Sequence, residues 1–90
     1  MNFETSASKV KLFKHPLHIQ EIFKLYALYK QGVEGDCPDE QVRLLSMDST
    51  STRNKLKIKY WAKLKGTDEY HARIEYCEYV DELIQKYGLL

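Results

Sequence analysis

The sequence predicts an all-α protein built as a four-helix bundle. Apolar residues recur at intervals of three and four along most of the chain, which is the period of an amphipathic helix. No segment has the sustained alternation of apolar and polar residues that a half-buried strand requires. A chain of 90 residues hides only about 60–65% of its unfolded surface, so we expect a single domain, residues 1–90, with one core.

The first helix is predicted near the start of the chain. Its apolar positions, at spacings of four, three and three, are Phe3, Ala7, Val10 and Phe13. We expect it to end near Lys14, because Pro16 cannot continue the ladder of helical hydrogen bonds.

The second helix has the clearest pattern. Its apolar positions are Ile19, Ile22, Phe23, Tyr26 and Tyr29, and it is expected to stop around Gly32 and Gly35. On a helical wheel one sector holds Ile22, Phe23, Tyr26, Tyr29 and Lys30, and another holds Leu25 and Leu28. This helix therefore has two apolar faces. One can pack on neighbouring helices while the other lines a site, although a small bundle could also bury both.

Residues 33–52 are rich in Gly, Asp, Ser and Thr and are predicted to form a long loop. The loop contains an apolar island of Val42, Leu44, Leu45 and Met47, through which we expect it to pack. A third helix follows from Arg53. One of its faces carries Leu56, Tyr60 and Leu64, with Trp61 beside them and Gly66 at its end.

The fourth helix is expected to begin at a Thr67 cap. Asp68 and Glu69 then lie in the first turn, where the helix dipole favours negative charge. Its apolar stripe runs to Gly88 through Ala72, Tyr76, Tyr79, Val80, Leu83 and Tyr87.

The net charge of +1 gives no overall attraction to DNA, to an anionic membrane or to an acidic partner. Locally, residues 53–65 hold six basic residues and no acid, and residues 68–82 hold six acids and one Arg73. These runs are either two solvated helix faces that attract each other or, for the basic run, a local anion site. The two cysteines, Cys37 and Cys77, are expected to be reduced thiols. With no signal peptide and no membrane span, a soluble cytosolic protein is predicted.

Catalytic and metal sites have little support in the sequence. His15 and His18 could supply half of a zinc site, but no second closely spaced pair completes it. Asp39 and Glu40 have no histidine or nucleophile near them, and no Gly-rich phosphate loop is present. We therefore predict no catalytic residue, no metal and no cofactor. Lysines interleaved with Tyr60 and Trp61 suggest RNA binding only weakly.

Tyr26, Tyr29 and Lys30 are the candidate binding residues. A single tyrosine on an apolar helical face is usually a partly buried core ring. Three such residues on one sector, with several lysines on another helix, favour a ligand that is aromatic, phosphorylated and partly apolar.

The segments KLYALYKQGVEGD, KLKGT and YCEYVDELIQKYG resemble the acyl-CoA-binding protein family. The matching positions are Tyr26, Tyr29, Lys30 and Gln31; Gly35 and Asp36; Lys55, Lys57 and Trp61; Leu64, Lys65, Gly66 and Thr67; and Tyr76, Val80, Leu83, Lys86, Tyr87 and Gly88. They occur in the family's order over nearly the whole chain. The resemblance implies an up-down-down-up four-helix bundle that binds acyl-CoA thioesters in a shallow bowl and carries them to acyl-CoA-using enzymes as a monomer.

The resemblance also implies a role for each site residue. Tyr29, Lys30 and Lys57 would hold the adenine and the ribose 3'-phosphate, and Tyr26 and Tyr76 would line the nucleotide and the start of the acyl chain. The rest of the groove would come from Ala7, Lys11, Ile22 and Phe23, and Arg53 keeps a cation where the family often has lysine.

One departure from the family pattern bears on specificity. Ile58 stands where the family has the first tryptophan of its third helix, so we expect a different preference for acyl-chain length. The alternative function is a divergent helical interaction or RNA-binding module that has lost the ligand.

Overall fold

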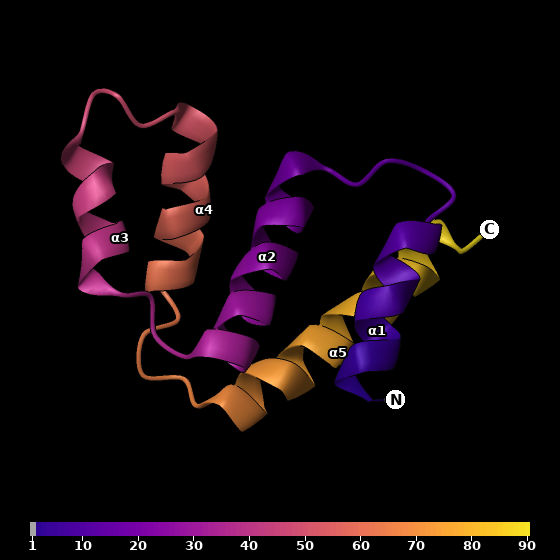
Figure 1. The fold of residues 1–90 in the computed structure, drawn as a ribbon. Coiled ribbons are helices and arrows are strands. Elements are labelled where there is room, and N and C mark those ends of the chain that lie inside the picture. Colours follow the sequence, from indigo (N-terminus) through magenta and orange to yellow (C-terminus); the bar gives the residue numbers. More distant parts are fainter. Residues whose placement is uncertain (1) are drawn as a thin grey trace.

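The computed structural model describes residues 2–90, and its regular elements are helical (Figure 1). In chain order they are α1 (Phe3–Lys9), the 3-10 turn η1 (Val10–Leu12), α2 (Ile19–Glu34), α3 (Asp39–Arg43), the 3-10 turn η2 (Leu44–Ser46), α4 (Thr52–Ala62) and α5 (Glu69–Tyr87). In Figure 1, α1 and α5 run in one direction and α2 and α4 in the other. The predicted all-α, up-down-down-up bundle is confirmed.

The core forms where α2 crosses α5. Its buried cluster consists of Leu25 and Leu28 from α2 and Tyr76, Val80 and Leu83 from α5. Gly32 lets the two helices approach closely, because a Cβ atom on it would lie 2.9 Å from Cγ of Arg73. Helix α1 covers the other side of α5, and α4 packs on α2 (Figure 1).

The segment predicted as a long loop contains a further short helix. Residues 39–46 form α3 and η2, which fold back on α4 as the outer arm of a hairpin (Figure 1). The apolar island packs only in part, since Leu44 and Leu45 are half-buried while Val42 and Met47 are exposed. Five residues of α3 form less than two turns, too short for the periodicity that identified the other helices.

The cap of α5 differs from the prediction. Asp68, not Thr67, is the N-cap residue, and its carboxylate accepts a hydrogen bond of 2.7 Å from the backbone N–H of His71. Glu69 is then the only acid in the first turn. Two carboxylate oxygens allow Asp68 to accept from the His71 ring as well, which Thr67 could not match.

Two other helices also end at positions that differ from the prediction. The first helix ends as an α-helix at Lys9 and continues only as the 3-10 turn η1, and α4 ends at Ala62, before Gly66. The last helix ends as predicted, with Gly88 at φ +77 and its N–H bonded to the Ile84 carbonyl at 2.8 Å.

Glu21 ties the start of α2 to the end of α5. It is 8% exposed, and its carboxylate accepts hydrogen bonds from the backbone N–H of His18 (2.9 Å), the Tyr87 hydroxyl (2.8 Å) and the Lys86 ammonium (3.1 Å). Burial alone would raise the pKa of Glu21, but these hydrogen bonds outweigh it and hold the pKa below its ordinary value.

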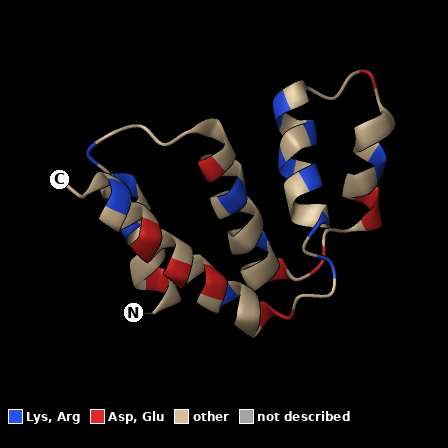
Figure 2. Cartoon of the chain, turned by 180° about the vertical axis from the view of Figure 1, so that it is seen from behind, with Lys and Arg blue, Asp and Glu red and all other residues tan. Residues whose placement is uncertain are grey.

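The basic and acidic runs lie on different parts of the molecule. Figure 2 shows Lys and Arg along α4 and Asp and Glu along α5. Within residues 2–90 the ion pairs are Lys30 with Glu34, Asp68 with His71 and Glu21 with Lys86, and none joins the two runs. The two faces therefore do not form the mutual contact that their charges suggested.

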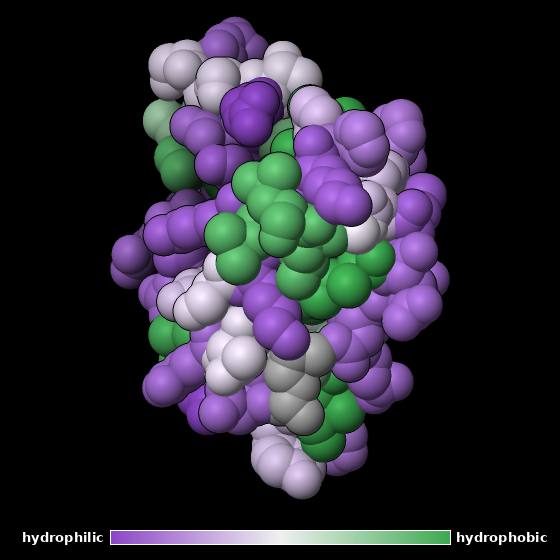
Figure 3. Space-filling view, turned by 90° about the vertical axis from the view of Figure 1, so that its right-hand side faces the viewer, coloured by the Kyte–Doolittle hydropathy of each residue, from purple (hydrophilic) through white to green (hydrophobic). Residues whose placement is uncertain are grey.

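An apolar patch lies on the side formed by α1 and the chain's C-terminal end (Figure 3). Leu12 and Leu90 are among the exposed large apolar residues of these segments. The backbone of Leu90 donates a hydrogen bond of 2.7 Å to the Leu12 carbonyl, and Phe13 forms an antiparallel bridge with Leu89. These contacts fix the tail to the end of η1.

Candidate functional site

One side of α2 is left uncovered between α4 and the α1–α5 pair, and we name it the open face. Residues at spacings of three and four form it, namely Ile19, Ile22, Tyr26, Tyr29 and Val33. Four of them are large apolar or aromatic side chains that are 36–50% exposed, and Tyr26 is half-buried. A continuous apolar stripe on the middle helix of a bundle is a surface suited to a ligand or a partner.

Two lysines flank the ring of Tyr26 from two different helices. The Nζ atom of Lys30 on α2 lies 5.9 Å from the ring centroid, and that of Lys57 on α4 lies 5.1 Å from it. Lys30 also lies over the Trp61 ring at 5.6 Å. The ion pair with Glu34 raises the pKa of Lys30, so this group stays cationic at neutral pH. Two ammonium groups from different helices therefore lie beside one aromatic ring.

Tyr29 belongs to a cluster of three rings. Phe3 of α1 stacks on Tyr29 with centroids 5.3 Å apart, and both rings meet Tyr76 of α5 edge-on, at 5.0 and 6.0 Å. Tyr29 is 42% exposed, whereas Tyr76 is 4% exposed. Burial raises the pKa of Tyr76 to about 12, so its hydroxyl remains protonated. Of the two tyrosines, Tyr29 is therefore the one on the surface.

Lys11 and Ile22 lie at the other end of the open face. Together with Pro16 and its neighbours they line a hollow of about 480 Å³, at the start of α2. Ala7 is half-buried and packs on the core cluster from α1. These residues are separated from Lys30 by more than two turns of α2, so the site is elongated rather than compact.

Phe23 and Arg53 form a separate contact. Phe23 is 1% exposed, with the Tyr60 ring 5.6 Å from it and the Arg53 guanidinium over it at 5.9 Å. Arg53 is exposed, whereas Phe23 lies beneath Tyr60 and Arg53 and is not accessible from the surface. Ile58, at the position of the family's tryptophan, is 5% exposed and also lies below the surface.

Two residues of the site were missed by the sequence patterns. Phe3 was assigned only to the apolar stripe of the first helix, because a contact across 26 positions to Tyr29 leaves no local signal. Glu34 lies four residues after Lys30, which is the spacing of a helical ion pair, so this contact does leave a local signal in the sequence.

Trp61 has a structural role that removes it from nucleic-acid stacking. It is 4% exposed, and its indole N–H donates a hydrogen bond of 2.9 Å to the Gly35 carbonyl. Tyr60 packs on Phe23. The basic run on α4 therefore lacks the free aromatic rings on which an RNA base would stack.

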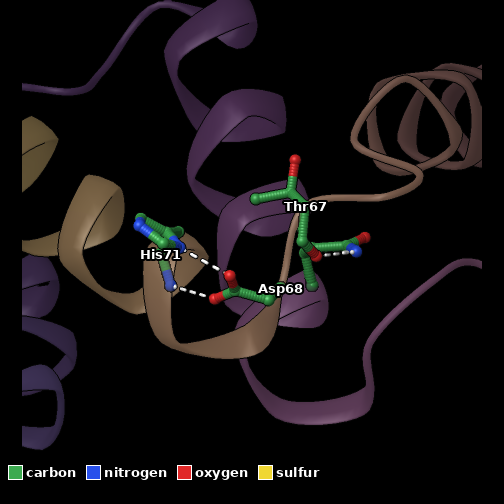
Figure 4. Close-up of polar contacts among 4 residues, drawn as sticks. Thr67, Asp68 and His71 are labelled. Carbon is green, nitrogen blue, oxygen red and sulfur yellow. Dashed lines mark hydrogen bonds and ion pairs between the residues drawn. The ribbon is translucent and has the colours of Figure 1, made fainter.

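Several motif residues form a junction instead of a binding surface. The buried amide of Gln31 donates to the Asp36 carboxylate and to the Thr67 carbonyl, both at 2.8 Å, and Asp36 also accepts from the Gly66 N–H at 2.9 Å. Figure 4 shows Thr67 beside the Asp68–His71 cap. The junction holds the end of α2 against the turn between α4 and α5.

Within residues 2–90, no group of three or more His, Cys, Asp or Glu side chains is arranged to hold a metal ion. Both cysteines are free thiols. None of the helices in this part of the chain is long and apolar enough to cross a membrane. The site offers aromatic rings, the ammonium groups of Lys30 and Lys57, and an apolar stripe.

Comparison with known proteins gives one consistent family. Residues 1–80 match the family model described as "Acyl CoA binding protein". A relative named "Acyl-CoA-binding protein" from Dictyostelium discoideum is 35% identical over 86 residues, which is 96% of each chain. "Acyl-CoA-binding protein homolog 1" of Caenorhabditis elegans is 34% identical over 88 residues, covering 98% of this chain and 96% of its own. An "Acyl-CoA-binding protein" of Saccharomyces cerevisiae is 35% identical over 86 residues, covering 96% of this chain and 93% of its own.

Proposed function

Because this chain belongs to the acyl-CoA-binding protein family, we propose that it binds medium- to long-chain acyl-CoA thioesters on the open face of α2 and carries them to the enzymes that use them. One observation supports this most: an exposed apolar stripe contains a tyrosine ring that two lysines flank. The proposed protein is a monomeric carrier in the cytoplasm, without catalytic residue or cofactor. Acyl-CoA is its ligand.

The nucleotide end of the ligand is assigned to the cationic end of the open face. Lys30 and Lys57 converge on one ring, so a 3'-phosphate between them would accept a charge-assisted hydrogen bond from each. Tyr29 exposes its ring, on which adenine can stack. Tyr26 and the buried Tyr76 would support this stack from below and lead towards the thioester.

The acyl chain is assigned to the other end of the open face. Ile22 and Lys11 line the hollow there, Ala7 would form its α1 side and Arg53 its α4 side. Each buried methylene contributes about 0.8 kcal/mol, so ten buried carbons would contribute roughly 8 kcal/mol before ordering costs. Affinity should therefore rise steeply with chain length.

Isothermal titration with matched ligands tests the phosphate assignment. We expect Lys30→Gln and Lys57→Gln each to weaken acyl-CoA binding about 10–100-fold, because each loses a charged hydrogen bond worth roughly 1.5–3 kcal/mol. Binding of the 3'-dephospho ligand should weaken less than about threefold in the same variants. Lys59→Gln is the control, since Lys59 is an exposed lysine of the same helix. Equal losses for both ligands would contradict the assignment.

A second titration tests the ligand class. Acyl-CoAs of increasing chain length are compared with free coenzyme A and with free fatty acid. The proposal expects one-to-one binding that needs both halves of the ligand. Affinity that did not depend on the acyl chain would show that the apolar stripe serves another purpose.

A further inference from the structure

A hollow of the described chain lies away from the open face, between the start of α1 and the outer side of α5. Its volume is about 680 Å³. Phe3 is common to the two surfaces, since it lines this hollow and also stacks on Tyr29. We name it the α1–α5 hollow. Its chemistry can be considered without reference to the proposed ligand.

The hollow follows α5 for about three turns. Its α5 wall consists of Tyr70, Arg73, Ile74, Cys77, Glu78 and Asp81. These positions recur at intervals of three and four, so they form one stripe, and the 11-residue span corresponds to roughly 16 Å of helix. An elongated channel of this length matches a short helix better than a compact small molecule.

The floor of the hollow is apolar and exposed. Ile74 is 38% exposed and Tyr70 is 70% exposed, and Phe3 and Cys77 are half-buried beside them. Large apolar side chains on the outer face of a helix contribute nothing to the core. They are available to a partner that brings apolar side chains of its own.

The rim of the hollow is acidic. Glu4 of α1 lines the hollow together with Glu78 and Asp81 of α5, and all three are exposed. Among the described residues of the lining, Arg73 is the basic one, and it already has partners: its Nε–H donates to the Gly32 carbonyl at 2.7 Å, and its guanidinium lies 5.6 Å from the Phe3 ring. The rim therefore presents negative charge on a chain whose net charge is +1.

We propose that the α1–α5 hollow binds a basic amphipathic helix, about three turns long, on a partner protein. The apolar side of that helix contacts Ile74 and Tyr70, and its Lys or Arg residues meet the acids of the rim. The same acids repel nucleic acid and anionic lipid, which excludes both as occupants. The proposal does not depend on acyl-CoA binding, because the open face consists of α2 residues and no α2 residue lines the α1–α5 hollow.

Binding of a defined peptide to the ligand-free protein tests the proposal. The probe is a fluorescein-labelled 18-residue peptide of Leu and Lys, with Leu at helical spacing on one side, followed by fluorescence anisotropy. One control peptide has the same composition in scrambled order, and another has Glu in place of Lys. Backbone amide shifts locate the bound peptide. We expect shifts along α5 and the start of α1, and at least tenfold weaker binding of both control peptides.

Matched variants separate the hollow from general charge attraction. The double variant Glu78→Gln with Asp81→Asn should weaken binding of the amphipathic peptide at least tenfold. Ile74→Ser should weaken it at least fivefold. The control is Glu40→Gln with Asp48→Asn, which makes the same change in net charge on exposed acids of residues 39–48. Its affinity for the peptide should stay within twofold of that of the unchanged protein. Circular dichroism checks that each variant keeps its helices.

Three results would overturn the proposal. The first is equal weakening by both double variants, which would mean that only net charge matters. The second is a set of amide shifts centred on α4 or on the open face. The third is a scrambled peptide that binds as well as the amphipathic one. Each can occur whether or not the chain binds acyl-CoA, so failure here does not bear on the proposed function.

Discussion

The two sides of α2 use similar residues for opposite purposes. On one side Leu25 and Leu28 are 5% and 2% exposed and pack in the cluster with α5. On the other side Ile22 and Tyr29 are 36% and 42% exposed, although the helical wheel marks both sectors as equally apolar. Periodicity thus reports that a face is apolar, and only the neighbouring helices decide whether it is core or surface.

The first prediction contrasts the two sides by truncation. Leu28→Ala should lower the free energy of unfolding by about 2–5 kcal/mol, because it leaves a cavity in the α2–α5 core. Ile22→Ala, on the open face, should cost less than about 1 kcal/mol and instead weaken binding of long acyl chains. Urea unfolding and titration measure the two effects. Similar losses of stability would mean that the open face is part of the core.

The second prediction tests whether the buried side chain at position 58 affects the open face of α2. A tryptophan is larger than the buried Ile58, so Ile58→Trp should lower the free energy of unfolding by about 1–3 kcal/mol or turn its ring towards the open face. The chain length of tightest binding should then move. Ile58→Leu is the volume-conserving control. If affinity depended on acyl-chain length in the same way for all three proteins, residue 58 would have no part in the chain-length preference.

The third prediction concerns the start of α2, which both sides share. Glu21→Gln should lower the free energy of unfolding by about 1–2 kcal/mol at pH 7, because the charged hydrogen bonds to Lys86 and Tyr87 weaken. The pKa of Glu21 is lower in the folded protein than its ordinary value of 4.5. Its contribution is therefore complete above that pH and is lost as the pH falls through the folded value.

Unfolding measured between pH 7 and pH 3 checks the sign of this effect. The difference in the free energy of unfolding between the unchanged protein and Glu21→Gln should be constant above about pH 5 and shrink in more acidic solution. Growth of the difference with acid would show that burial, and not hydrogen bonding, controls the Glu21 carboxyl.

The smallest predicted effect concerns the open face alone. Glu34 pairs with Lys30 and places a negative charge where a phosphate is proposed to bind. Glu34→Gln should therefore tighten acyl-CoA binding about two- to fivefold, an effect of less than about 1 kcal/mol as expected for an exposed pair. The 3'-dephospho ligand should respond less. If Glu34→Gln bound acyl-CoA more weakly instead, the ion pair would be needed to orient Lys30 for binding.

Most of the fold could be predicted because its helices carry long apolar patterns and clear stops. Gly88, at φ +77, ends α5 where expected. Helix α3 was missed because its five residues have no periodicity of their own and are stabilised by packing on α4. The Asp68 cap was missed because Thr67 and Asp68 are both good capping residues, and only the backbone geometry distinguishes them.

The site was predictable where residues share one helix. Tyr26, Tyr29 and Lys30 fall on one sector of α2 by spacing alone. The approach of Lys57 to Tyr26 and the stacking of Phe3 on Tyr29 depend on how α4 and α1 sit against α2, which the Gln31 junction and the core determine. Burial of Phe23 under Tyr60 likewise depends on a contact between two helices. Roles of these residues in binding stay predictions.

The molecule is flat, with extents of 39 × 27 × 15 Å. An acyl-CoA on the open face would cover the apolar side chains that the neighbouring helices leave exposed, and it would act as a detachable part of the interior. At a ligand concentration 100 times the dissociation constant, the folded state would gain about 2.7 kcal/mol. The lifetime of such a carrier in the cell would then follow the supply of its cargo.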